Sequence, residues 1–292
     1  MCLDIRRLRI VLLSLAVVSS ASGQGYNYDN PSEWNNEYET CRGNRQSPID
    51  LFRSQAINET NLPRLSFNEY NIPITMPVEA INNGHTVHVD VNNVVDGNRP
   101  SVTGGGVNET YEAQSFHFHW GSQDSKGSEH EINKKKYDVE LHIVHKNVKF
   151  ANLTEASKDP SGILVLGIML KKWQFVPTPR TGLNEVYDVL PELSKYNSRK
   201  ALNHSITMDS ILSGLNTRHF YTYQGSLTTP PCSEAVTWFV FPDVVPIQSR
   251  YLKRFWNLYD SRNVPLLNNF RPIQNTEGRD VFYREGKQAQ KR

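Results

Sequence analysis

Ser115-Phe-His-Phe-His-Trp-Gly121 is the densest run of chemically active side chains in this chain of 292 residues. Its alternation of aromatic residues and histidines is typical of a β-strand, on which successive side chains point to opposite faces. His117 and His119 then share one face, and the aromatic rings share the other. Two imidazoles on one face are a start for a zinc site, but zinc needs at least one further ligand. Taken alone, the pair is also compatible with two half-exposed histidines.

A second segment, Glu140-Leu-His142-Ile-Val-His145, offers the further ligand from another predicted strand. Glu140 and His142 share a face, so the carboxylate is placed to accept one ring N–H of His142 and to fix its tautomer. Three histidines without a fourth protein ligand leave a coordination position for water, which is the pattern of catalytic zinc sites. From the residues alone, a zinc site and a set of ordinary core histidines both remain open.

Short runs of alternating or β-branched residues, separated by Gly and Pro, occupy most of the chain. They predict strands over residues 85–91, 115–120, 137–145, 163–170, 220–223 and 235–241. The stretches that look helical are few and short, at 183–190, 209–215 and 249–260. Because no repeat and no break in composition divides the chain, we expect one large, mainly β (α+β) domain.

The N-terminus has the pattern of a secretory signal peptide. A basic stretch ends at Arg9, an apolar run covers residues 10–18, and small residues continue to Gly23. The apolar run is too short to span a bilayer, so a cleaved signal over residues 1–23 is favoured over a membrane anchor. We therefore expect a secreted, extracellular protein. Without this segment the chain carries equal numbers of acidic and basic residues, so nothing indicates a nucleic-acid partner.

The cysteines and the sequons fit the same expectation. Cys2 leaves with the signal peptide, and we expect the remaining Cys41 and Cys232 to form a disulfide, with two free thiols as the alternative. The polar residues 286–292 predict a disordered C-terminal tail without an anchor. Four N-x-S/T sequons predict glycosylation at Asn58, Asn108, Asn152 and Asn203.

Seven motifs together resemble an α-class, animal-type carbonic anhydrase, in particular its extracellular members. Besides the two histidine segments they are Gln46-Ser-Pro-Ile-Asp50, Asn82-Asn-Gly-His85, Gly127-Ser-Glu-His130, Lys134-Lys-Lys-Tyr137 and Gly225-Ser-Leu-Thr-Thr-Pro-Pro231. They follow the family order over almost the whole chain. The resemblance implies one catalytic domain, residues 24–285, built on a large, mostly antiparallel twisted β-sheet, with zinc at the base of a conical cleft.

The resemblance also implies the reaction and its central residues. His117, His119 and His142 would hold one Zn²⁺ per chain, and zinc-bound hydroxide would attack CO2 to give bicarbonate and a proton. Thr228 would orient the hydroxide, and Glu129 would accept the hydroxyl proton of Thr228.

Further residues are assigned around the ligands by the same resemblance. Glu140 would accept an N–H of His142, and the main-chain carbonyl of Asn269 would accept one from His119. Ser115 stands where many family members have a glutamine that accepts from the first histidine ligand. Since serine is shorter, we expect this contact to be lost or made through water.

The remaining assignments concern the substrate and the proton. His85 would shuttle protons to buffer, with Tyr28 and Asn83 in an ordered-water network. His88 stands where Asn or Gln is common, and would either relay protons or line the rim. The apolar wall of the CO2 pocket and its polar rim would be formed by Val144, Val165, Leu227, Thr229, Val236 and Trp238.

Two other histidines and two other classes of protein bear on this assignment. His130 and His145 resemble buried, hydrogen-bonded family histidines, so they are not expected to be ligands. Non-catalytic relatives lack one or more zinc histidines, and enzymes of mineralising matrices often carry acidic or Gly/Asn-rich inserts; neither pattern is present here. The implied partners are CO2 and bicarbonate, with sulfonamides and small anions as inhibitors, whereas a monomer and a dimer are both open.

Overall fold

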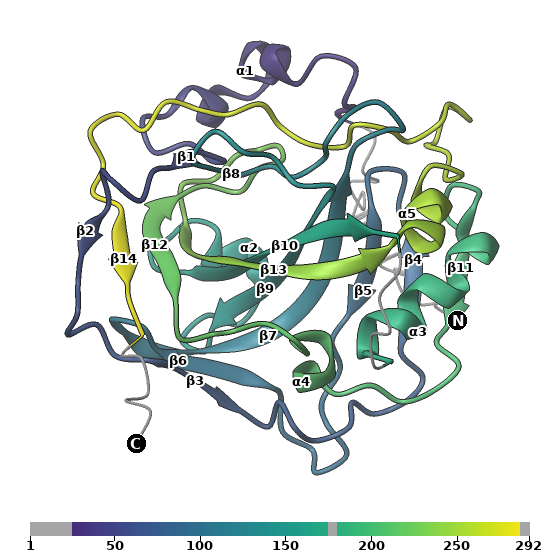
Figure 1. The fold of residues 1–292 in the computed structure, drawn as a ribbon, viewed down its shortest axis with the longest axis horizontal. Coiled ribbons are helices and arrows are strands. Elements are labelled where there is room, and N and C mark those ends of the chain that lie inside the picture. The colour runs from purple at the N-terminus through teal and green to yellow at the C-terminus, as the bar shows by residue number, and fades with distance from the viewer. Residues whose placement is uncertain (1–24, 175–179, 287–292) are drawn as a thin grey trace, which may run out of the picture.

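The computed structural model describes residues 25–174 and 180–286. Within them a 12-stranded mixed, twisted sheet dominates the fold and short helices surround it (Figure 1). This confirms the predicted mainly β class. The expected signal peptide, residues 1–23, lies outside the described residues. Of the expected tail, residues 286–292, only Gly286 is described, and it is buried. In the described ranges, no helix has the length and apolar character that a membrane span requires.

The main sheet has the strand order β11-β4-β5-β7-β9-β10-β13-β12-β14-β2, and β3 joins it through β6, which pairs with β7. Two neighbouring pairs, β10–β13 and β14–β2, are parallel, and the others are antiparallel. A separate two-stranded sheet pairs β1 with β8. The strands are β1 (Asp50–Leu51), β2 (Ile57–Asn58), β3 (Leu65–Asn68), β4 (Glu79–Asn82), β5 (Val87–Asp90), β6 (Ser101–Gly104), β7 (Val107–Trp120), β8 (Glu131–Ile132), β9 (Val139–Asn147), β10 (Ile163–Trp173), β11 (Arg199–Ala201), β12 (Phe220–Gly225), β13 (Val236–Gln248) and β14 (Phe282–Arg284).

The helices are short, and α3, α4 and α5 gather at one end of the sheet (Figure 1). Two of them are shorter than predicted. The expected helix 209–215 stops early because the chain leaves the helical conformation at Leu212 and turns at Gly214, whose φ is +86°. The α-helices are α1 (Trp34–Glu37), α2 (Leu153–Ala156), α3 (Gly182–Val189), α4 (Met208–Ile211) and α5 (Ser249–Phe255), and the 3₁₀ helices are η1 (Pro31–Glu33), η2 (Glu39–Arg42) and η3 (Leu190–Leu193).

Strand β10 lies at the centre of the main sheet. Its first eight residues, Ile-Leu-Val-Leu-Gly-Ile-Met-Leu, are all buried. Such a continuous apolar run is typical of a strand that is covered on both faces and pairs in parallel, as β10 does with β13. On its other side β10 pairs with β9, and β9 pairs with β7. The two strands that carry the histidine motifs therefore lie at the middle of the sheet.

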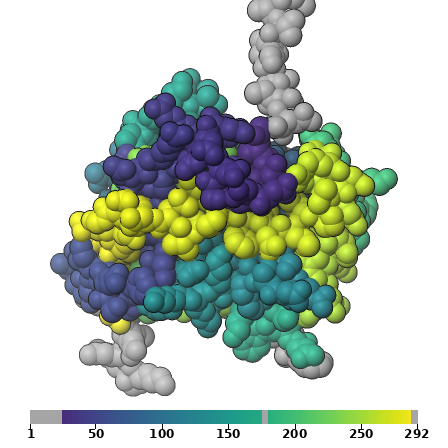
Figure 2. All heavy atoms as spheres, turned by 90° about the horizontal axis from the view of Figure 1, so that it is seen from above, coloured from purple at the N-terminus to yellow at the C-terminus, as the bar shows by residue number. Residues whose placement is uncertain are grey.

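The N-terminal and C-terminal segments lie side by side on one face of the molecule (Figure 2). The N–H of Gln274 donates to the carbonyl of Pro48 at 2.8 Å, and the guanidinium of Arg271 donates to Gln46 Oε1 at 2.8 Å. These contacts bring residues more than two hundred positions apart to the same region. Both segments therefore help to shape the site described next.

Candidate metal centre

Three histidines extend from the two central strands toward one another. His117 and His119 lie on one face of β7, and the register pairs His117 with His142 and His119 with Glu140 on β9. One ring nitrogen from each of the three histidines lies within 4.8 Å of the corresponding atoms of the other two. The opposite face of β7 is buried in the core, as its alternation predicts, through Phe116, Phe118 and Trp120.

Hydrogen bonds determine which nitrogens of two histidines face the centre. His119 donates its Nδ1–H to the carbonyl of Asn269 at 2.8 Å, which leaves Nε2 with a lone pair. His142 donates its Nε2–H to Glu140 Oε1 at 2.7 Å, which leaves Nδ1 with a lone pair. Within the described residues, the buried Nε2 of His119 has no hydrogen-bond partner. A buried imidazole nitrogen with a free lone pair is what a metal ligand requires.

The environment keeps all three imidazoles neutral. Burial lowers the pKa of His119 to about 4, holds the pKa of His117 well below its ordinary value, and lowers the pKa of His142. Neutral imidazole is the form that binds metal ions. In the part of the chain that the structure describes, this group has three nitrogen donors and no fourth protein ligand, which fits a catalytic zinc ion.

Glu140 is the hub of the hydrogen bonds behind this centre. Its Oε1 accepts from His142 Nε2 and from His130 Nδ1, both at 2.7 Å, and its Oε2 accepts the backbone N–H groups of Glu129 and His130, both at 2.8 Å. Burial alone would raise the pKa of Glu140, but His130 and His142 outweigh it and hold the pKa well below its usual range. The ionised carboxylate thereby fixes the orientation of His142.

Two further histidines are buried and satisfied by hydrogen bonds. His130 Nε2 accepts the O–H of Tyr223 at 2.7 Å. His145 Nε2 accepts the O–H of Tyr70 at 2.6 Å, and its Nδ1–H donates to the carbonyl of Ile143 at 3.1 Å. This is the arrangement expected of core histidines that are not ligands.

Glu129 and Thr228 lie beside the ligands. Glu129 is fully buried, its Oε1 accepts the N–H of Arg271 at 2.8 Å, and its Oε2 lies 3.5 Å from His119 Nε2. Burial raises the pKa of Glu129 to about 7, against the opposing effects of His142 and of hydrogen bonds from Thr228 and Arg271. The structure therefore brings the two predicted partners together at the edge of the histidine cluster.

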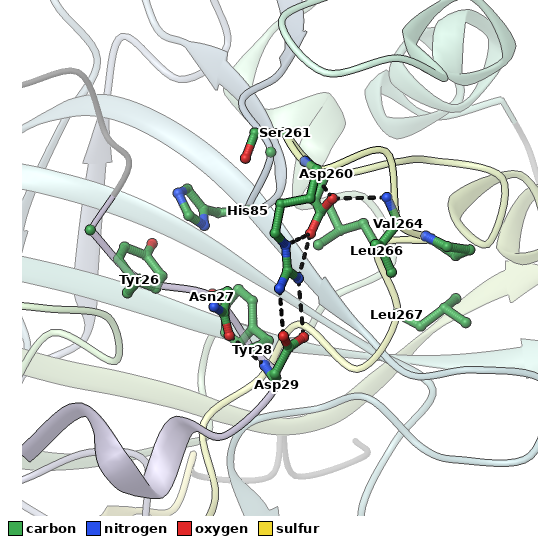
Figure 3. A pocket seen from close by; sticks show the side chains of 14 residues that line it. Tyr26, Asn27, Tyr28, Asp29, His85, Asp260, Ser261, Val264, Leu266 and Leu267 are labelled. Atoms are coloured by element: carbon green, nitrogen blue, oxygen red, sulfur yellow. Dashed lines mark hydrogen bonds and ion pairs between the residues drawn. The ribbon is translucent and has the colours of Figure 1, made fainter.

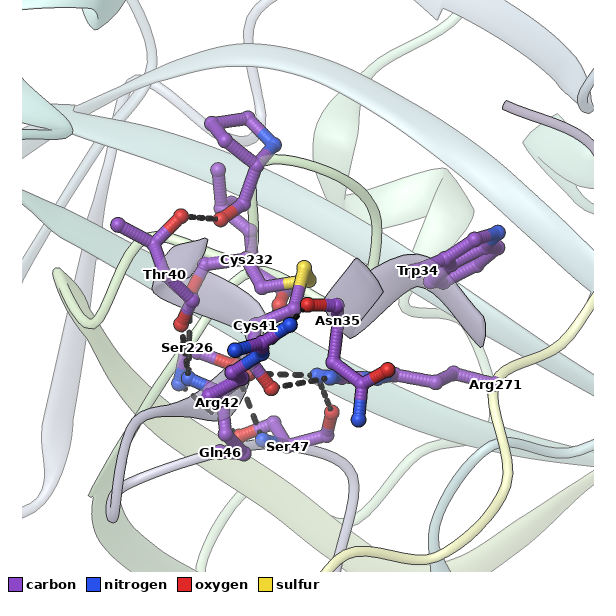
Figure 4. The surroundings of a disulfide bond; sticks show 12 residues. Trp34, Asn35, Thr40, Cys41, Arg42, Gln46, Ser47, Ser226, Cys232 and Arg271 are labelled. Carbon is purple, nitrogen blue, oxygen red and sulfur yellow. Dashed lines mark hydrogen bonds between the residues drawn. A yellow bond between two sulfur atoms is a disulfide. The ribbon is translucent and has the colours of Figure 1, made fainter. Parts of the chain in front are cut away.

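Thr228 belongs to the connection between β12 and β13, which a disulfide ties to the N-terminal segment (Figure 4). Cys232 bonds to Cys41, as predicted, with 4.9 Å between their Cα atoms. The N–H of Cys232 donates to the carbonyl of Thr229 at 2.8 Å, which closes a tight turn. The hydroxyl of Thr40, next to Cys41, donates to the carbonyl of Pro231. The connection between β12 and β13 is thus anchored a few residues after Thr228.

The predicted CO2 pocket is a contiguous apolar cluster on three adjacent strands. The register pairs Val144 of β9 with Val165 of β10, and Val165 with Trp238 of β13. The ring of Trp238 lies 4.8 Å from that of His142, centroid to centroid. Val236 is buried in the same cluster, and Leu227 packs against it. The structure thus brings five of the predicted pocket residues together beside a candidate ligand.

His85 lies at the rim of a cavity of about 340 Å³ (Figure 3). The side chain of Asn83 fixes the turn before it, since its Oδ1 accepts the N–H groups of His85 at 3.0 Å and of Thr86 at 2.9 Å. Gly84, with a φ of +83°, permits this turn. Tyr28 also lines the cavity, whereas none of the candidate metal ligands does. His85 and Tyr28 thus share the wall of this cavity.

Tyr26 is a site residue that sequence reasoning missed. Its ring stacks on the imidazole of His85 with 4.1 Å between the centroids, and its hydroxyl is hydrogen-bonded to Thr229 and to Tyr28. Burial, partly offset by these bonds, raises the pKa of Tyr26 to about 12, so the phenol keeps its proton at neutral pH. The two tyrosines of Tyr26-Asn-Tyr28 are the sequence feature that could have indicated this role. Only Tyr28 matches a family position.

His88 and Ser115 lie on the neighbouring strands β5 and β7. The register pairs His88 of β5 with His117, and Asp90 with Ser115. His88 Nε2 is hydrogen-bonded to Asp90 Oδ1 at 2.9 Å. Ser115 is buried, and the loss of its contact with His117 stays a prediction.

The four sequon asparagines, Asn58, Asn108, Asn152 and Asn203, are all exposed. One of them has a structural role, because Asn152 Oδ1 accepts the N–H of Glu155 and caps α2. Exposure does not make an asparagine a glycosylation site, and glycosylation stays a prediction.

The family model for eukaryotic-type carbonic anhydrase matches residues 29–285. The chain belongs to this family of enzymes. It is similar to carbonic anhydrase 7 of Homo sapiens, with 37% identity over 265 residues that cover 89% of this chain and 96% of the relative. Carbonic anhydrase 7 of Mus musculus is 36% identical over 263 residues, 88% of this chain and 95% of the relative.

The family establishes the reaction and corrects one prediction. The chain is a carbonic anhydrase that catalyses the reversible hydration of CO2, and its family depends on zinc and is inhibited by sulfonamides. The predicted secretion is contradicted, because the relatives are carbonic anhydrase 7, a cytosolic isoform. The predicted extracellular subtype is not supported by these relatives. That prediction rested on residues 1–23, outside the described part, and on a cysteine pair. Cα atoms 4.9 Å apart allow a disulfide by geometry alone, so the pair does not establish the compartment.

Proposed function

We propose that His117, His119 and His142 hold the zinc ion of this carbonic anhydrase, within a catalytic domain of residues 24–285. The observation that carries the assignment is the grouping of one nitrogen from each histidine within 4.8 Å. The second nitrogens of His119 and His142 are engaged by Asn269 and Glu140, so their remaining lone pairs are directed to the shared centre. When bound, zinc lowers the pKa of a water molecule to about 7 and so supplies hydroxide at neutral pH.

Thr228 and Glu129 are proposed to orient the nucleophile. Glu129 accepts hydrogen bonds from Thr228 and from the Arg271 N–H. Since the Thr228 proton is directed to Glu129, the Thr228 oxygen is left as an acceptor on the side of the histidine cluster. A nucleophile that donates its own proton to Thr228 has a lone pair aimed at the substrate carbon, which is catalysis by positioning.

The apolar cluster on β9, β10 and β13 is proposed to bind CO2. Carbon dioxide is small and apolar and gains little from hydrogen bonds, so a hydrophobic wall beside the metal suits it. Val144 and Leu227 are partly exposed on this wall, and Thr229 adds a polar edge. Bicarbonate carries a charge and is held poorly by such a wall, which favours its release.

His85 is proposed to carry the proton away from the centre. An imidazole titrates near neutral pH, and His85 borders both Tyr28 and the cavity of about 340 Å³. Asn83 holds the backbone of His85 through its Oδ1, so its amide N–H groups are left to bind water. Proton transfer through such a rim residue is a step separate from the attack on CO2.

CO2 hydration by the purified chain, with and without a zinc chelator and a primary sulfonamide, tests the proposal. We expect the chelator to abolish activity, stoichiometric zinc to restore it, and the sulfonamide to inhibit. Small anions are expected to inhibit at the same place. His119→Ala should lose both zinc and activity. The matched control is His145→Gln, a buried histidine outside the cluster, which should retain one zinc per chain; loss of zinc from both variants alike would contradict the ligand assignment.

A further inference from the structure

Arg271 is a buried arginine with 3% of its surface exposed, and it lies beneath the disulfide (Figure 4). Its Nη1 donates to Gln46 Oε1 at 2.8 Å and to the carbonyl of Ser47 at 2.9 Å, and its Nη2 donates to the carbonyl of Cys41 at 3.3 Å. Burial lowers the pKa of Arg271 to about 10, which keeps the side chain charged at neutral pH. A buried charge of this kind fixes its neighbours strongly, because each lost contact leaves it unsatisfied.

The backbone of the same residue reaches the catalytic carboxylate. The N–H of Arg271 donates to Glu129 Oε1 at 2.8 Å, across 142 positions of sequence. Anchoring the guanidinium therefore also fixes the direction of the N–H that holds Glu129.

Gln46 extends the contact to the second cysteine. While its Oε1 accepts from Arg271, its Nε2 donates to the carbonyl of Cys232 at 3.3 Å and to Glu234 Oε1 at 3.0 Å. The carbonyls of both cysteines are thus connected to Arg271, one directly and one through Gln46.

We infer that Arg271 is a positioning residue through which the Cys41–Cys232 disulfide holds Glu129. This inference rests on the proposed roles of Thr228 and Glu129. The disulfide then acts on the pair along two routes, since Cys232 anchors the connection that carries Thr228 and Cys41 anchors Arg271. Reduction of the disulfide would loosen both partners of one hydrogen bond at once.

A double-mutant cycle combining Arg271→Met with Cys41→Ser/Cys232→Ser tests the inference. We expect Arg271→Met to lower kcat/KM for CO2 about 10-fold, because this ratio covers the attack on CO2. Saturated kcat should fall less, since it also includes the return of the proton to buffer. The combined variant should be no worse than the disulfide-free protein, because both changes break the same route. Arg271→Lys, which keeps the charge, should recover part of the loss.

A second readout does not depend on activity. In the metal-free protein, hydrogen exchange of the Arg271 amide should become roughly 10-fold faster both in Arg271→Met and in the disulfide-free variant. The matched control is Arg284→Met. Arg284 is another buried arginine, and its side chain donates to the carbonyls of Leu62 and Arg218, away from the site. We expect Arg284→Met to lose stability and to keep kcat/KM.

The outcomes separate the inference from the function on which it rests. Unchanged kcat/KM in Glu129→Gln and Thr228→Ala would refute the proposed roles. If those variants lose activity while Arg271→Met keeps wild-type kcat/KM and exchange, or if its losses multiply with those of disulfide removal, the inference is wrong. If Arg271→Met does not fold, Gln46→Met removes the acceptor of the guanidinium and the bond to Cys232; wild-type kcat/KM in that variant is then the overturning result.

Discussion

The phenol ring of Tyr26 lies nearly parallel to the imidazole of His85, with 4.1 Å between the centroids and 16° between the planes. Tyr26 is also hydrogen-bonded to Thr229. One residue of the N-terminal segment therefore contacts both the proposed proton shuttle and the polar edge of the proposed CO2 pocket. The stack holds the imidazole at one position of the rim.

Removing the stack should slow proton release. An aromatic pair of this kind contributes about 0.5–1.5 kcal/mol, so Tyr26→Ala should lower kcat at low buffer by roughly 2- to 10-fold. Tyr26→Phe keeps the ring and should keep kcat. By NMR, the ring protons of His85 should move downfield in Tyr26→Ala and stay in place in Tyr26→Phe. Identical His85 signals in all three proteins would contradict the stack in solution.

His85→Ala should lower kcat at low buffer by about 100-fold, the lower end for the loss of an acid–base group, while kcat/KM for CO2 stays the same. Added imidazole buffer should restore kcat. We expect His85→Ala/His88→Ala to show no further loss, because Asp90 already engages Nε2 of His88. A further decrease in the double variant would instead establish His88 as a second relay.

Ser115→Gln should slow the loss of zinc. A glutamine is long enough to accept from His117, and such contacts behind a ligand typically change metal affinity about 10- to 100-fold. The measurement is the rate of zinc transfer to a chromogenic chelator, with Ser115→Ala as the control that adds no acceptor. Equal dissociation rates in Ser115→Gln and the wild type would show that the missing glutamine is unimportant here.

Asp260 should contribute to stability in a pH-dependent manner. Its Oδ1 accepts the N–H groups of Arg262 at 2.9 Å and Val264 at 3.0 Å, and its Oδ2 accepts from the Arg262 guanidinium at 2.6 Å. Burial alone would raise the pKa of Asp260, but these bonds outweigh it and lower the pKa. A lowered folded-state pKa stabilises the protein at pH values above the unfolded-state pKa, which is about 3.9. This contribution is lost as the pH falls through the folded-state pKa.

Asp260→Asn should therefore cost about 1–3 kcal/mol at pH 7 and clearly less at about pH 3. Urea unfolding at both pH values measures the difference from the wild type. Asp243→Asn, an exposed aspartate on β13, serves as the control with little effect at either pH. A cost for Asp260→Asn that does not change with pH would show that the ionised form is not responsible.

The strand pattern was sufficient to predict the centre of the site but not its surroundings. The alternation around His117 and His119 predicted a shared face, and the spacing of Glu140 and His142 predicted their hydrogen bond, because both depend only on the period of a strand. Arg271 could not be found this way, since its bond to Glu129 joins residues 142 positions apart. Contacts of that kind are set by tertiary packing, which local sequence does not encode.

Patterns at the ends of elements and of the chain were less reliable. The helix expected over residues 209–215 is only Met208–Ile211, because a turn at Gly214 overrides the apolar spacing. The prediction of secretion from the apolar run 10–18 was wrong. The composition of that run resembles a signal peptide, but composition alone does not determine where a protein is localised. Sequence alone does not single out Tyr26. Its role depends on its contact with His85, and only the fold brings these two residues together.

The placement of all three candidate ligands on β7 and β9 has a consequence for the loss and rebinding of the metal. These strands pair with each other at the middle of the sheet, and we expect their hydrogen bonds to open only when most of the protein unfolds. The donor atoms are thus already assembled before any ion arrives. Demetallated chains should be recoverable by simple readdition of zinc, without passing through denaturation, even after long storage in the empty form.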